Sequence, residues 1–82
     1  MELPQRMPEK QEYRRILGEF YDGAKTRQWF HRAELIELHS THMKPTLEIY
    51  CSYNPVLEMK EILQFTDKYK LALEIVTLSN KD

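Results

Sequence analysis

Residues 31–44, HRAELIELHSTHMK, hold all three histidines of this 82-residue chain together with two glutamates. Zinc in proteins takes three or four ligands from histidine, cysteine and carboxylate side chains. The nearest such set is His39, His42 and Glu37, with Cys51 opposite if the chain turns back on itself. The H-x-x-H spacing is weakly specific, however, because two histidines in a surface turn are usually solvated. We therefore expect no metal and no cofactor, and keep His39 and His42 as the weak candidates for a metal site.

Nucleophilic catalysis would need Cys51, the single cysteine, beside a histidine base and a site for a developing oxyanion. The two glycines of the chain, Gly18 and Gly23, provide neither a glycine-rich phosphate loop nor a nucleophile elbow. A domain of this length also offers little volume for a deep pocket. We therefore expect the protein not to be an enzyme, and we interpret Cys51 as a buried, inert thiol.

The segment AKTRQWFHR (24–32) interleaves basic and aromatic side chains. Basic groups neutralise phosphates and aromatic rings stack on unpaired bases, so this pattern predicts nucleic-acid binding as an alternative function. The candidate residues are Lys25, Arg27, Trp29, His31 and Arg32. A net charge of −1 and a pI near 6.3 do not favour this alternative. The competing interpretation, which we favour, places Trp29 and Phe30 in the core or at the edge of the sheet, with the basic side chains solvated around them.

The elements that would position these residues are clearest in the C-terminal half. PTLEIYCSY (45–53) alternates, with Leu47, Ile49, Cys51 and Tyr53 on one face, which predicts a half-buried strand. LALEIVTL (71–78) is rich in β-branched and aliphatic residues and predicts a second strand.

Two helices are predicted by apolar stripes at helical spacing. The first follows a flexible tail at residues 1–7 and ends near Gly23, with Gly18 interpreted as a close packing contact. The second covers about 55–69, with Asn54 as its N-cap and proline at the first helical position. Because this second helix connects two strands of one sheet, those strands should be parallel.

Residues 33–39 fit two interpretations. As a strand they would pair with 46–53 across a turn at 40–45. As a helix, which local propensity slightly favours, they would place His39 and His42 near enough to chelate. The strand agrees better with the rest of the fold, because two parallel strands alone form too little sheet to be stable. We favour the strand and keep the helix as the alternative.

Together these elements predict one α+β domain over residues 1–82. Its order is αββαβ, a small three-stranded mixed sheet covered by two helices. This order is similar to a ferredoxin-like fold that has lost or replaced its first strand, an analogy of topology that implies no activity.

The expected sheet also predicts how the protein acts. If both helices cover one face, the other face presents Tyr50, Val76 and Leu78 among polar residues. Apolar sheet faces and strand edges favour association, so we expect a small regulatory protein that forms a homodimer or docks on a larger protein. A lone cysteine, a polar N-terminus and the lack of a long apolar run predict a cytoplasmic protein without membrane contact.

Overall fold

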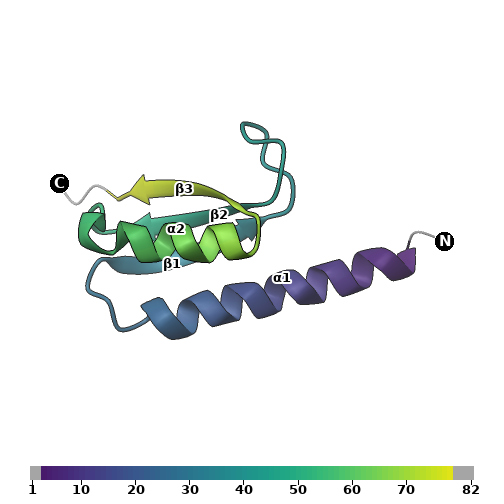
Figure 1. The fold of residues 1–82 in the computed structure, drawn as a ribbon, viewed down its shortest axis with the longest axis horizontal. Helices are drawn as coiled ribbons and strands as arrows, with labels where there is room; N and C mark the ends of the chain where they lie inside the picture. Colours follow the sequence, from purple (N-terminus) through teal and green to yellow (C-terminus); the bar gives the residue numbers. More distant parts are fainter. Residues whose placement is uncertain (1–2, 79–82) are drawn as a thin grey trace.

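The computed structural model describes residues 3–78, with the side chains of residues 11–78. Its elements in chain order are α1 (Leu3–Ala24), β1 (Phe30–Ile36), β2 (Thr46–Cys51), the 3₁₀ turn η1 (Val56–Glu58), α2 (Met59–Lys68) and β3 (Ala72–Thr77). The predicted α+β order of helix, two strands, helix and strand is confirmed (Figure 1). No helix in this part of the chain is long and apolar enough to cross a membrane.

The three strands form one mixed sheet in the order β1-β2-β3. β1 runs antiparallel to β2, and β2 runs parallel to β3 through the crossover that contains α2. The strand interpretation of residues 33–39 is right about the element but not about its bounds, because β1 spans Phe30–Ile36. The strand starts early because Trp29 and Phe30 pack into the core, and residues 37–45 form the connection to β2.

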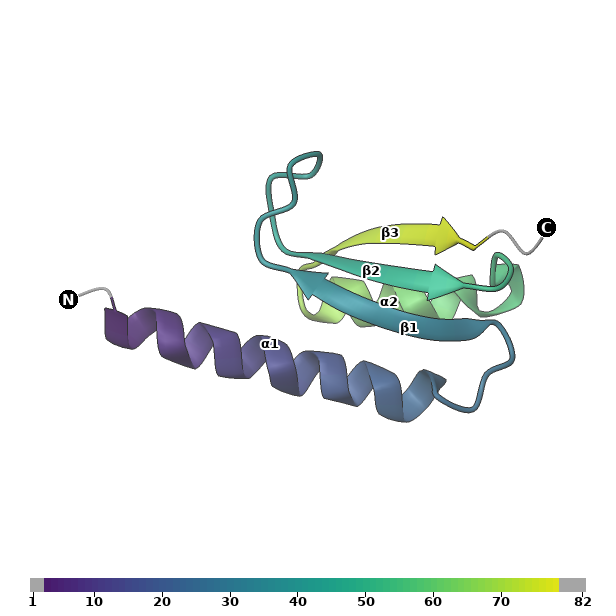
Figure 2. The same cartoon turned by 180° about the vertical axis from the view of Figure 1, so that it is seen from behind.

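Both helices pack against the same face of the sheet, with α1 running along β1 (Figures 1 and 2). The helices also contact each other, since the rings of Phe20 in α1 and Phe65 in α2 have centroids 5.3 Å apart. The core fills the space between these layers. Its buried apolar residues are Ile16, Phe20, Ala24, Trp29, Ala33, Leu47, Ile49, Cys51, Ile62 and Leu71. The predicted inward face of β2 is therefore confirmed for Leu47, Ile49 and Cys51. It is wrong for Tyr53, which lies beyond the end of the strand and is exposed.

Some helix features differ from the expectations. α1 begins at Leu3, so residues 3–7 of the expected tail are helical here, while their flexibility stays a prediction. The N-cap prediction for Asn54 is wrong, because Pro55 occupies the position before η1 and no side chain caps it. The close contact predicted at Gly18 is also wrong: a Cβ added there would meet no atom within 4 Å.

The start of β1 carries an irregularity, where the pairing with β2 shifts between Phe30 and Arg32. The extra residue is His31, which is exposed. A bulge of this kind interrupts the regular alternation of side chains. Consequently Phe30 and Ala33 both pack with the helices, while Arg32 lies over Tyr50 on the other face of the sheet.

Candidate functional site

One outer edge of the sheet, that of β1, is covered at its middle by α1. The Tyr21 hydroxyl donates to the carbonyl oxygen of Ala33 at 3.1 Å and accepts from the Ala33 N–H at 2.9 Å. The N–H and C=O of Ala33 point away from β2, and the Tyr21 hydroxyl therefore bonds both of them. An edge whose N–H and C=O groups are already bonded is a poor template for another strand.

The other outer edge, that of β3, has no neighbouring strand in the described part of the chain. The N–H groups of Ala72 and Leu78 both donate to carbonyl oxygens on the β2 side, at 2.9 and 2.8 Å. Because these groups alternate in direction along a strand, the N–H and C=O groups of Leu73, Ile75 and Thr77 point away from the sheet. β3 thus presents a row of backbone donors and acceptors along its outer edge.

The sheet face opposite the helices, here called the open face, brings together two of the three residues predicted to bind a partner (Figure 2). Tyr50 and Val76 are direct register partners on β2 and β3, and both are half-buried. Leu78 follows β3 and is half-buried too. The Arg32 guanidinium lies 3.9 Å from the centre of the Tyr50 ring. Partner binding by this set stays a prediction.

A row of three glutamates crosses the open face. Glu34, Glu48 and Glu74 are partners in register on β1, β2 and β3. Like charges on directly opposite positions of neighbouring strands repel. Each carboxylate has a basic side chain beside it: Arg32 for Glu34, His39 for Glu48 and His42 for Glu74. The Tyr50 hydroxyl also donates to Glu48, at 2.9 Å, and this hydrogen bond is the main cause of a raised pKa at Tyr50.

The two metal-site candidates, His39 and His42, lie together with ring centroids 5.1 Å apart, but each ring is engaged by a glutamate. Nε2 of His39 lies 3.3 Å from Glu48, and Nε2 of His42 lies 2.7 Å from Glu74. The Thr41 N–H donates to Nδ1 of His39 at 3.1 Å, so a neutral His39 carries its proton on Nε2. A metal-bound histidine normally donates from its second nitrogen, which this arrangement does not allow.

Cys51 lies on the opposite side of the sheet from these histidines. It is fully buried against the helices, and burial raises the pKa of its thiol. It therefore cannot complete the ligand set that the sequence suggested. Among residues 11–78, no group of three or more His, Cys, Asp or Glu side chains is arranged to hold a metal ion.

The aromatic part of the nucleic-acid candidate lies inside the protein. Trp29 is only 4% exposed and Phe30 is half-buried, with their ring centroids 5.9 Å apart. The interpretation of Trp29 as a core residue is therefore confirmed, and Phe30 packs against that core from the start of the edge strand β1. A buried indole cannot stack on a base in this conformation.

The basic part of the same candidate does not form one surface. Lys25 lies 3.9 Å from Asp22, Arg27 lies 4.0 Å from Glu61, Arg32 pairs with Glu34, and His31 is exposed at the bulge. Arg27 points to the helix side of the sheet while Arg32 lies on the open face. Nucleic-acid binding stays a prediction, without the stacking aromatic on which it depended.

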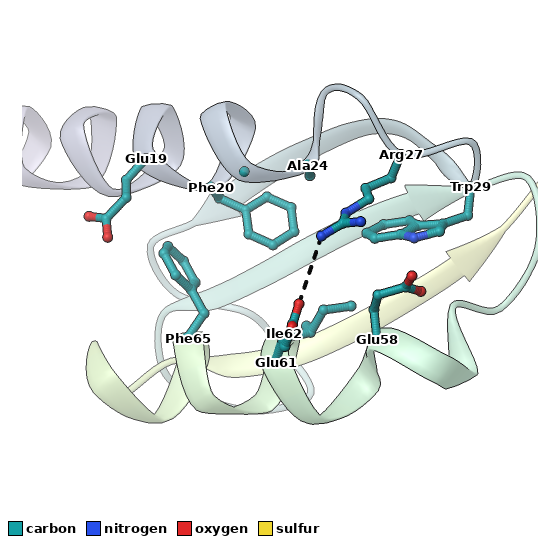
Figure 3. A pocket seen from close by; sticks show the side chains of 10 residues that line it. Glu19, Phe20, Ala24, Arg27, Trp29, Glu58, Glu61, Ile62 and Phe65 are labelled. Atoms are coloured by element: carbon teal, nitrogen blue, oxygen red, sulfur yellow. Dashed lines mark ion pairs between the residues drawn. The ribbon is translucent and has the colours of Figure 1, made fainter.

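A pocket of about 180 Å³ lies between the end of α1 and the start of α2 (Figure 3). Its apolar lining is Phe20, Ala24, Trp29, Ile62 and Phe65, and its charged rim is Glu19, Arg27, Glu58 and Glu61. The sequence pattern did not reveal this pocket, because its walls come from two helices and a connection that are far apart along the chain. One feature of the sequence could have indicated the pocket: the single tryptophan, Trp29, lies at the boundary between a helix and a strand.

Comparison of the chain with known protein families, with curated proteins and with solved structures finds no significant match in any of the three. The geometry of these surfaces is therefore the ground on which a function can be proposed.

Proposed function

We propose that this protein acts by binding another polypeptide through the outer edge of β3, and that a second copy of the chain is the partner. The observation that carries the proposal is the difference between the two outer strands. Tyr21 of α1 bonds the outward N–H and C=O of Ala33 in the middle of the β1 edge, whereas β3 has only β2 beside it among the described residues. Strand edges left open in this way accept further strands by main-chain hydrogen bonding.

The residues of β3 support strand addition. The strand reads ALEIVT, which is rich in β-branched and aliphatic residues and lacks the lysine or proline that protects many natural edges. Its one charged residue, Glu74, is engaged by His42 at 2.7 Å. Leu73 and Ile75 are half-buried, so a neighbouring strand would cover them further.

A two-fold axis at Ile75 makes this edge self-complementary. In that antiparallel register Ile75 faces its own copy and Leu73 faces Thr77 of the second copy, so about six main-chain hydrogen bonds can form. Glu74 then lies opposite Val76 rather than opposite another glutamate, which avoids a like-charge pair. The two sheets would join into one, with Val76 and Tyr50 of the open face close to the junction.

Comparison of Thr77→Pro with Thr77→Val tests the proposal. Thr77 is exposed and its N–H points outward, so proline removes a donor that a single copy does not use. Valine keeps both the N–H and the β-branched shape. We expect wild type and Thr77→Val to sediment as dimers, and the proline variant to dissociate with a Kd about tenfold higher or more.

Amide exchange gives a second measurement of the same interface. The amides of Leu73, Ile75 and Thr77 should be protected in concentrated wild-type protein and exchange faster on dilution. Wild type that stays monomeric at several hundred micromolar, or a dimer that Thr77→Pro leaves intact, would overturn this interface. Retention on nucleic acid at low salt that is lost at high salt would instead favour the basic segment.

A further inference from the structure

We infer that the pocket between α1 and α2 is a docking site for a peptide segment of a partner protein. The segment inserts one bulky apolar side chain into the pocket and carries a basic residue next to it. This site goes beyond the proposed function, because it lies between the helices and neither needs nor blocks pairing at the outer edge of β3 (Figures 1 and 3).

The indole of Trp29 supplies the first argument. Its ring is only 4% exposed, yet its Nε1–H has no hydrogen-bond partner within the described structure. Buried tryptophan nitrogens usually have an acceptor, because a buried donor without one is unfavourable. Figure 3 shows the nitrogen on the edge of the ring that is turned toward α2 and Glu58. Because this nitrogen is itself buried, a carbonyl oxygen that enters the pocket would reach it, and supply the missing acceptor, only as the pocket wall opens.

The size and lining of the pocket supply the second argument. Its volume of about 180 Å³ is close to that of an engineered cavity that binds benzene, roughly 150 Å³. The lining combines the rings of Phe20, Trp29 and Phe65 with the aliphatic side chain of Ile62. One aromatic or branched aliphatic side chain therefore fits, and a larger ligand would project out of the pocket.

The charges at the rim supply the third argument. Arg27 lies 4.0 Å from Glu61, and Glu19 is bonded by two side chains at the end of α2. The carboxylate of Glu58 has no ion-pair or hydrogen-bond partner among the described side chains. Three carboxylates around a single guanidinium disfavour an acidic ligand, whereas a basic residue beside the anchor would pair with Glu58.

A peptide satisfies these three features together. Its apolar side chain occupies the lining, its main-chain carbonyl accepts from Trp29, and its basic neighbour meets Glu58. Interfaces commonly use such an arrangement, in which one buried anchor is surrounded by a polar rim.

The test follows the indole resonance of Trp29 by NMR, because this is the only tryptophan of the chain. The probe is the capped dipeptide acetyl-Phe-Lys-amide, titrated into the isotope-labelled full-length protein. We expect a saturable downfield shift of the Nε1–H resonance as the new hydrogen bond forms. Acetyl-Phe-Glu-amide, which reverses the charge, and acetyl-Ala-Lys-amide, which lacks the anchor, should bind more weakly.

Two glycines on the same helix provide a blocking variant and its control. Gly23 lines the pocket, and a Cβ added there would meet no atom within 4 Å, so Gly23→Leu adds bulk to the pocket lining at a position whose Cβ has open space. Gly18 has equally open space but lies outside the pocket. The Kd of the dipeptide should rise about tenfold or more in Gly23→Leu and stay unchanged in Gly18→Leu. Matching amide spectra confirm that both variants are folded.

The charge argument has its own matched pair, Glu58 at the end of η1 and Asp67 in α2. Glu58→Gln should raise the Kd of the basic dipeptide about two- to fivefold, the range expected for one exposed ion pair. Asp67→Asn removes an exposed carboxylate outside the pocket and should leave that Kd unchanged.

Three outcomes would overturn the inference. The site itself is wrong if the indole resonance does not move at millimolar probe, or if Gly23→Leu binds as wild type does. Equal affinity for the acidic and basic dipeptides would refute the charge selection. The titration repeated in the Thr77→Pro background keeps this result separate from the association of β3 edges.

Discussion

The chemistry of individual residues depends on the face of the sheet on which each one lies. Tyr50 and Cys51 are neighbours in sequence, but Tyr50 lies under Arg32 on the open face while Cys51 is fully buried against the helices. A hydrogen bond to Glu48 raises the pKa of Tyr50, and burial raises the pKa of the Cys51 thiol. Both groups therefore stay protonated in the folded protein at neutral pH.

The buried thiol predicts a loss of stability at alkaline pH. In the unfolded chain Cys51 titrates near its ordinary pKa of about 8.5, whereas its pKa in the folded protein is higher. Above that pH the unfolded state releases a proton that the folded state retains, so the free energy of unfolding falls as pH rises. We expect this slope in urea titrations from about pH 8.5 to 9.5. Cys51→Ala should be less stable at every pH but show a flatter slope in this window; equal slopes would contradict the assignment.

At the scale of elements, the start of β1 is the point where α1 meets the sheet. The Phe30 ring has its centroid 5.1 Å from that of Tyr21 and 5.8 Å from that of Phe20. This aromatic contact aligns α1 with β1 and places the Tyr21 hydroxyl at the backbone of Ala33. The helix thereby protects one edge of the sheet, whereas the described chain offers no such cover for β3.

Removal of the Tyr21 hydroxyl should therefore weaken the attachment of α1. Tyr21→Phe keeps the ring contacts but leaves the N–H and C=O groups of Ala33 without their protein partner. We expect the free energy of unfolding to fall by about 1–2 kcal/mol in urea titrations, with faster exchange of the Ala33 amide. Tyr53→Phe, at a side chain that is 51% exposed, is the matched control and should change little. A Tyr21→Phe protein as stable as wild type would refute this role.

The molecule is more elongated than a compact domain with the same number of residues. Its extents are 49 × 24 × 19 Å and its radius of gyration is 13.7 Å, against about 12 Å for a compact domain of this length. The N-terminal part of α1 accounts for the difference, because it extends beyond the sheet (Figures 1 and 2). A domain of this size is expected to have a free energy of unfolding of about 4–12 kcal/mol, so association would change its stability appreciably.

Association through β3 predicts that the melting temperature depends on protein concentration. Dimerisation stabilises only the folded chains, so each tenfold increase in concentration should raise Tm by about 3–5 °C. Thr77→Pro should show a smaller dependence over the same range, and Thr77→Val should follow wild type. Differential scanning calorimetry at several concentrations provides the measurement. A wild-type Tm that does not change with concentration would count against the dimer.

The fold was predictable where local pattern and burial agree. The alternation in 45–53 identified β2 and its inward face correctly, because residues two apart on a strand share one face. The start of β1 was not predictable in this way, because Trp29 and Phe30 stand among basic residues and become core only when α1 packs on them. The row formed by Glu34, Glu48 and Glu74 likewise requires the register of three strands.

The sequence by itself determined the class of the fold, the order of its elements and the buried face of β2, because these follow from periodicity over a few residues. Only the tertiary structure decided that His39 and His42 meet glutamates, that Trp29 lines a pocket with its N–H unpaired, and that one sheet edge is closed. These features depend on the distance between residues far apart along the chain, as the pairing of Tyr21 with Ala33 illustrates. A local sequence pattern does not predict the distance between two residues that are far apart along the chain.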